Sequence, residues 1–109
     1  MAVHVLGDLN KVPESLGAHF NPFGRSHGTP TDDERHVGSL GNIEANDKGI
    51  AQIEIHDKLV KLIGPLSIIG RSMVVYSDED DLGKGGAELS LINGNAGTVQ
   101  AYGVVGISQ

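Results

Sequence analysis

The chain has 109 residues, a formal net charge of −6, 16 glycines and no cysteine. This length suits a single domain, residues 1–109, with one modest core, and the lack of cysteine excludes a disulfide. The negative charge argues against nucleic acid and anionic membranes as partners, and neither a membrane-spanning apolar stretch nor a signal peptide is visible, so a cytoplasmic location is expected.

Short β-branched or alternating runs predict about six strands. They are expected at residues 1–8, 40–45, 50–56, 59–63, 71–76 and 99–107. Within 50–56 the apolar residues Ala51, Ile53 and Ile55 alternate with polar ones, as in a half-buried strand. The segment Asn46 to Gly49 predicts a turn, because Asn and Gly tolerate positive φ. With few helices, these strands predict an all-β antiparallel Greek-key barrel or sandwich.

Two long loops with no regular period interrupt the predicted strands. The second, 77–98, is acidic at first and then rich in glycine. The first, 19–39, carries three of the five histidines, His19, His27 and His36. Long irregular loops in compact domains are usually functional, and three neutral imidazoles converging on one zinc ion would hold this loop in shape. Their spacing matches no local ligand motif, so three solvated histidines are the alternative.

Five segments of the chain together resemble the copper/zinc superoxide dismutase family. They are HFNP…HG.P…D.ERHVG.LGN at 19–42, LIGPLSIIGRSMVV at 62–75, DDLGKGG at 80–86, GNAG at 94–97 and GVVGIS at 103–108. The chain is identified as a member on this resemblance, which implies a flattened eight-stranded barrel that disproportionates superoxide to oxygen and hydrogen peroxide. The chain would then begin within the fourth strand, and an incomplete barrel without the first strands is expected.

The resemblance implies a zinc site in which one ligand is changed. The family's three histidines and one aspartate correspond to His19, His27, His36 and Ser39. A hydroxyl is a poor zinc ligand beside a carboxylate, so zinc is expected to bind at least about tenfold more weakly. A water, Asp32 or Asp33 are alternative fourth ligands. Asp80 corresponds to a carboxylate that would fix the tautomer of His27, and a solvated acid is the alternative.

The resemblance implies a copper site with only two of its four imidazoles. His4 and the bridging His19 remain, whereas Ala2 and Tyr76 stand where the other two would be. A neutral phenol, with a pKa near 10, is a poor replacement for an imidazole. The arginine that guides superoxide corresponds to Val99. Copper binding is therefore expected to be weak or absent, and a surface strand histidine is the alternative for His4.

These changes predict a superoxide-dismutase-like protein with weak or no catalysis, serving as a zinc-binding or partner-binding scaffold. Its partner would be an intact superoxide dismutase or a copper chaperone. The alternatives are a functioning copper/zinc superoxide dismutase with rearranged ligands and a structural remnant that binds no metal. The resemblance also implies a homo-oligomer, expected to be a dimer, through small and apolar residues. These residues are Ile69, Gly70, Val104, Val105, Gly106 and Ile107.

Overall fold

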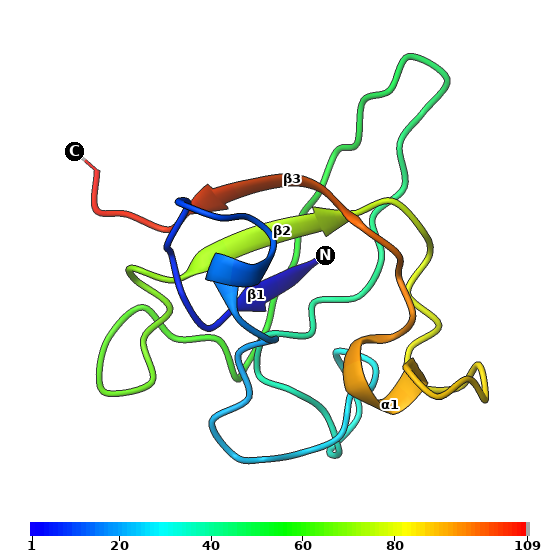
Figure 1. Cartoon of the computed structure of the whole chain (residues 1–109), viewed down its shortest axis with the longest axis horizontal. Coiled ribbons are helices and arrows are strands. Elements are labelled where there is room, and N and C mark those ends of the chain that lie inside the picture. The colour runs from blue at the N-terminus through cyan, green and yellow to red at the C-terminus, as the bar shows by residue number, and fades with distance from the viewer. Residues whose placement is uncertain (109) are drawn as a thin grey trace.

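The computed structural model describes residues 1–108 and is built around one antiparallel sheet (Figure 1). The strands lie in the order β1-β2-β3 and are β1 (Ala2–His4), β2 (Ser72–Tyr76) and β3 (Val99–Val104). The helices in the described residues are a 3₁₀ helix (Glu14–Leu16) and α1 (Ser90–Asn93). No helix within residues 1–108 is both long and apolar enough to cross a membrane. The all-β class with few helices is confirmed, but the sheet does not close into a barrel.

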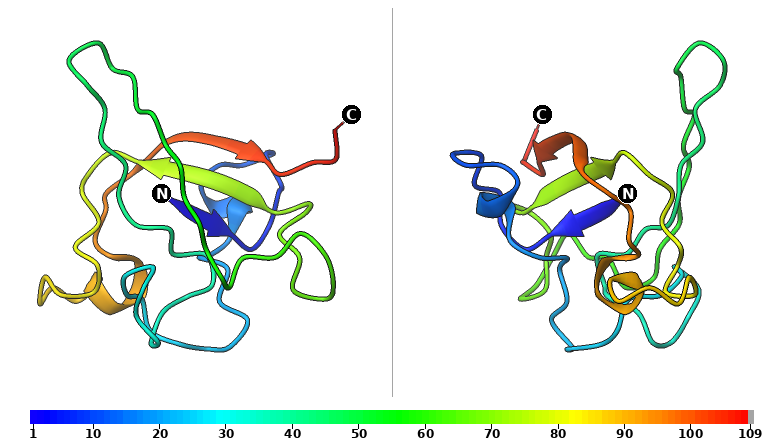
Figure 2. Two further views of the ribbon diagram at one scale, coloured as in Figure 1. Left: turned by 180° about the vertical axis from the view of Figure 1, so that it is seen from behind. Right: turned by 45° about the vertical axis from the view of Figure 1, so that its right-hand side comes forward.

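Segment 40–63 differs from the prediction, because none of the three strands expected there forms. The turn is present: Asn46 donates to the Ile50 carbonyl at 2.8 Å, and Gly49 has a φ of 76°. Around this tip the chain extends away from the sheet as an arm (Figure 2). The exposed fractions of Ile50 and Ile53 are 55% and 47%. Alternation predicted a half-buried strand, but a strand needs a neighbour for its hydrogen bonds, and none in the described residues pairs with the arm.

The core surrounds β1 and holds the first long loop against it. Its buried members are Val3, Phe20, Val37, Leu40 and Ile68. On the strand edge that does not pair with β2, Val3 accepts from Phe20 N–H at 2.8 Å and donates to the Gly38 carbonyl at 2.8 Å. A Cβ at Gly38 would overlap the Val3 carbonyl, so this approach requires glycine. These contacts place His19 and Ser39 directly beside β1.

A buried arginine ties the same loop to the base of the arm. Arg35 is 2% exposed, and its guanidinium donates to the Asp57 carboxylate at 2.7 Å. It also donates to three backbone carbonyls at 2.6–3.0 Å, those of Pro30, His36 and Val37. A buried charge is tolerated when it is paired and its remaining donors are satisfied, as here. The loop is therefore held by this arginine as well as by its core contacts.

Candidate metal centre

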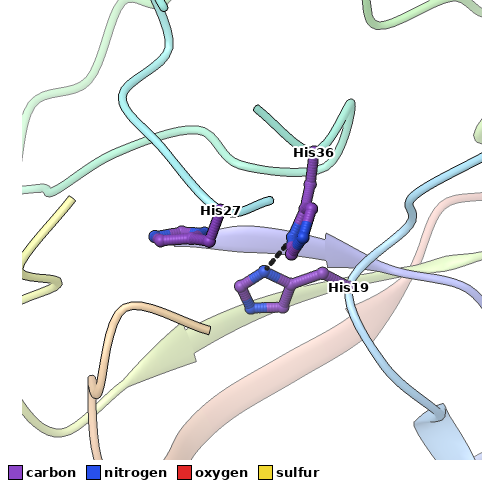
Figure 3. Close-up of side chains that lie close together, drawn as sticks. All are labelled: His19, His27 and His36. Atoms are coloured by element: carbon purple, nitrogen blue, oxygen red, sulfur yellow. Dashed lines mark hydrogen bonds between the residues drawn. The ribbon is translucent and has the colours of Figure 1, made fainter. Parts of the chain in front are cut away.

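The three histidines of the first long loop are buried, and their side chains lie close together (Figure 3). One ring nitrogen from each of His19, His27 and His36 lies within 4.8 Å of the others. His19 Nδ1 and His36 Nδ1 are 3.1 Å apart. Tetrahedral zinc, with Zn–N bonds of roughly 2.0–2.1 Å, separates its nitrogens by about 3.3 Å. The three side chains thus meet as expected, in an arrangement that fits one zinc ion, and we call them the histidine triad.

Ser39 lies beside the triad, at the sequence position that corresponds to the family's fourth ligand. It is fully buried, and its Oγ lies 2.9 Å from His27 Nδ1. The alternative ligand Asp32 instead accepts from the Thr29 backbone at 2.9 Å and lies 3.6 Å from Lys84. Among residues 1–108 no carboxylate joins the three nitrogens within the same distance. A neutral hydroxyl therefore lies beside the triad, where the family resemblance places an anionic ligand.

A buried carboxylate sets the orientation of His27. His27 Nε2 is 2.7 Å and 2.9 Å from the two Asp80 carboxylate oxygens, so the expected contact is present. Burial alone would raise the pKa of Asp80, but hydrogen bonds from His27 and Leu82 outweigh it and lower the pKa. An ionised carboxylate only accepts, so the proton of neutral His27 is on Nε2 and the Nδ1 lone pair faces the triad. The Asn42 side chain bonds both backbone groups of Asp80, at 2.8 and 2.9 Å.

The other nitrogen of His19 faces a tyrosine and a second histidine. His19 Nε2 is 3.1 Å from the Tyr76 hydroxyl, which also hydrogen-bonds to His4 Nε2. His4 is 8% exposed, so it is not the surface strand histidine considered as an alternative. Its Nδ1 donates to the Gly17 carbonyl at 2.7 Å. A register shift between Val75 and Tyr76 re-aims the end of β2 at this point. The Tyr76 hydroxyl thus occupies the space between the two Nε2 atoms.

Burial keeps this group of residues neutral. It is the main cause that lowers the pKa of His19 to about 3, and repulsion from His4, His27 and His36 adds to it. Burial also lowers the pKa of His4 and raises that of Tyr76 above its ordinary value of 10. Metal ions bind the neutral form of imidazole. His4 and His19 are therefore favoured in the neutral form that a metal requires.

A cleft of about 610 Å³ opens beside Tyr76 and is acidic. Its lining includes the three acidic residues Glu44, Asp78 and Glu79, and Met1 with its terminal ammonium, and neither lysine nor arginine. Val99, at the position of the family's guiding arginine, pairs with Tyr76 across β2 and β3. A cleft in which one sign of charge predominates repels ions of that sign. The excess of carboxylates in this cleft therefore disfavours a small anion and favours a cation.

The family model described as copper/zinc superoxide dismutase (SODC) matches residues 1–105. The chain belongs to the copper/zinc superoxide dismutase family. A relative from Cryptococcus neoformans var. grubii, named superoxide dismutase (Cu-Zn), is 57% identical over 108 residues, which cover 99% of this chain and 70% of the relative. Relatives of the same name from Kluyveromyces lactis and Saccharomyces cerevisiae are 54% and 49% identical over 106 residues, 97% of this chain and 68% and 69% of theirs. The resemblance is thus confirmed.

For this family member, the sequence predicts the residues of the site better than their contacts. The prediction for Tyr76 is only that it replaces a copper-binding histidine, and it does not include the hydrogen bonds by which the Tyr76 hydroxyl joins His4 to His19. The predicted site also omits Asn42, which holds the backbone of Asp80. The signal for Asn42 was available, since it ends the motif LGN that supports the resemblance. No sequence signal indicated the role of the Gly17 carbonyl, because any residue supplies that acceptor.

Proposed function

We propose that this chain is a metal-dependent superoxide dismutase in which the copper ligands are rearranged. The supporting observation is the buried histidine triad, found in a chain 49–57% identical over almost its whole length to proteins named superoxide dismutase. Zinc would be held by His19, His27 and His36. The His27 nitrogen that faces the triad is unprotonated, as a zinc ligand must be. The donor set therefore fits zinc, and Ser39 in place of a carboxylate makes the binding weaker.

The residues on the other side of His19 form a smaller set of donor atoms, which would hold copper. They are two imidazole nitrogens, His4 Nε2 and His19 Nε2, and the Tyr76 hydroxyl oxygen. Imidazole suits copper, and the oxygen is the rearranged part of the set. A copper ion held there would supply one-electron exchange with superoxide. The chain's own residues contribute the rest: the Gly17 carbonyl orients His4, and His19 presents Nδ1 to the triad and Nε2 to Tyr76.

A zinc-binding scaffold with little or no catalysis is the second candidate. It is favoured by the acidic cleft beside Tyr76 and by Val99, because both remove the positive field that would attract superoxide. In this candidate the chain would act through a partner, an intact superoxide dismutase or a copper chaperone. A tagged chain should then capture one of these two purified proteins, and repeated failure with both would count against the scaffold.

Metal content and superoxide removal separate the two candidates. The chain is purified without added metal, its copper and zinc are counted, and inhibition of superoxide-driven dye reduction is measured. The dismutase predicts bound copper with inhibition, lost in His19→Gln and kept in His56→Gln, because the His56 side chain is 88% exposed and lies outside the site. Zinc without inhibition supports the scaffold. A chain that takes up neither metal, and that zinc does not stabilise against heat, contradicts both.

We also propose that the chain forms a homodimer. The surface is formed by Ile69, Gly70, Val104, Val105, Gly106 and Ile107, and it includes residues that are strongly exposed. The exposed fractions of Val104 and Ile107 are 47% and 90%, and apolar residues exposed together often mark contact surfaces. Analytical ultracentrifugation is expected to show a dimer that Val104→Asp dissociates. A monodisperse monomer of the unaltered chain would refute this proposal.

A further inference from the structure

The Tyr76 hydroxyl is the centre of a chain of hydrogen bonds that ends at the histidine triad. These hydrogen bonds link the Gly17 carbonyl to His4 Nδ1, His4 Nε2 to the Tyr76 hydroxyl, and the Tyr76 hydroxyl to His19 Nε2. A phenol has one proton, so it can donate to only one of the two imidazoles and must accept from the other. The direction of each bond therefore follows from whichever end of the chain is fixed.

The fixed end is the Gly17 carbonyl, because a carbonyl only accepts. His4 Nδ1, 2.7 Å away, must carry a proton, and at neutral pH His4 then has no second proton for Nε2. His4 Nε2 is therefore an acceptor, and Tyr76 donates its proton to it. Toward His19 the phenol oxygen accepts, so His19 Nε2 must be the protonated nitrogen. His19 Nδ1 then carries a free lone pair, and it is the atom that faces His36 in the triad.

We propose that Tyr76 is a positioning residue that holds His19 as the Nε2–H tautomer and so presents its Nδ1 to zinc. This inference rests on the zinc site proposed above. Tyr76 does for His19 what the Asp80 carboxylate does for His27, which is to bind the nitrogen that points away from the metal. Such outer partners typically change metal affinity by about 10- to 100-fold when they are removed. In the copper-free protein, where His19 Nε2 keeps its proton, Tyr76 prepares the zinc side of His19 without touching the zinc.

The first test replaces each tyrosine of the chain in turn, in copper-free protein. Tyr76→Phe removes only the hydroxyl, and Tyr102→Phe is the matched control because Tyr102 is 48% exposed on β3. Competition with a chromophoric chelator is expected to show zinc binding about 10- to 100-fold weaker for Tyr76→Phe and within about twofold of the unaltered chain for the control. Equal zinc affinity for Tyr76→Phe and the unaltered chain overturns the proposal.

Nitrogen-15 NMR of labelled histidines reads the tautomer directly in the metal-free protein. In the unaltered chain, His19 is expected to show a protonated Nε2 and an unprotonated Nδ1, and in Tyr76→Phe a mixture of the two tautomers. A protonated Nδ1 in the unaltered chain overturns the proposal whatever the variants do. This readout is independent of function: a chain that shows the expected tautomer but takes up no zinc contradicts the zinc site and not the hydrogen-bond chain.

His4→Phe is a second variant. If Tyr76 only filled space, this variant would not weaken zinc binding. His4 does not belong to the triad, but its loss frees the Tyr76 proton to turn toward His19 Nε2 and favour the wrong tautomer. Zinc binding should weaken although Tyr76 and all three triad histidines remain. The double variant His4→Phe/Tyr76→Phe should be no weaker than Tyr76→Phe alone, because both act through one chain. Full additivity of the two losses contradicts the proposal.

Discussion

Replacing Ser39 by aspartate tests whether this position is the fourth corner of the zinc site. Ser39 is fully buried, with Oγ 2.9 Å from His27 Nδ1, so a carboxylate there would face the same space as the triad nitrogens. The change replaces a neutral hydroxyl by an anionic oxygen, which zinc prefers. We expect Ser39→Asp to tighten zinc binding at least about tenfold, which corresponds to about 1.4 kcal/mol.

The same variant should be less stable without metal. A carboxylate buried without a cation costs on the order of several kcal/mol, so the metal-free melting temperature should fall. With zinc in excess over both dissociation constants, a tenfold gain in affinity adds about 1.4 kcal/mol to the stabilisation by zinc. For a chain of this size, the rise in melting temperature on adding zinc should then be larger by about 4–6 °C than in the unaltered chain.

The assay is a thermal melt across a zinc titration, with a chelator competition for the affinity. Ser72→Asp is the matched control, because Ser72 is also fully buried but bonds the Leu6 carbonyl outside the triad. The control should lose stability equally with and without zinc. If Ser39→Asp binds zinc no more tightly than the unaltered chain, Ser39 does not occupy the fourth position and the reasoning fails.

Three further predictions concern the supports of the site. Gly94→Ala puts a Cβ onto the Asp80 carboxylate and should weaken zinc binding, measured by calorimetry, about 10- to 100-fold. Gly86→Ala is the control for backbone strain, because Gly86 has a φ of +74°, close to the +76° of Gly94, but a Cβ there would meet no neighbouring atom. Arg35→Ala removes a buried charge partner and should cost about 3–5 kcal/mol in urea unfolding, with a loss below about 1 kcal/mol contradicting its role. The pKa of His19 is about 3 in the folded chain and 6.5 ordinarily, so the unfolded chain binds the proton first as the pH falls. The stability of the metal-free chain should therefore fall as the pH drops from about 6.5 toward 3, and it should fall less steeply in His19→Gln.

Local chemistry explains which parts of the fold were predictable. The β-branched pair Val74 and Val75 indicated β2, and the turn at 46–49 followed from residues that tolerate positive φ. The alternation of 50–56 predicts a half-buried strand, yet Ile53 is 47% exposed. Alternation shows that two faces of a segment differ, but whether a neighbouring strand covers one of them is a long-range property. Such a property is not contained in the segment's own residues.

The residues of the site were also predictable only in part. His19, His27 and His36 were predictable because a motif orders them, and their convergence required only that the loop fold as the family resemblance implies. The contacts of Tyr76 were not, because they join residues 57 and 72 positions apart and depend on a register shift at the end of β2. A one-residue change of register turns a strand side chain to the opposite face. From the sequence alone, Tyr76 could be read as a missing ligand but not as a hydrogen-bonding partner.

The charges around the candidate site favour a metal cation and oppose an anion such as superoxide, and the dependence of the rate on salt should reveal this. Glu44, Asp78 and Glu79 border the cleft at Tyr76, with Asp80 behind His27, in a chain whose net charge is −6. An attractive field makes the rate of encounter with an anion fall as salt screens it, so a repulsive field reverses the slope. The copper-loaded chain should therefore remove superoxide faster at 0.1 M ionic strength, where the screening length is about 10 Å, than at 0.01 M, where it is about 30 Å.

The double variant Glu44→Gln/Glu79→Gln should flatten this dependence of the rate on salt. A rate that falls with added salt would show that positive groups govern the approach, and the carboxylates of the cleft would then have no part in it.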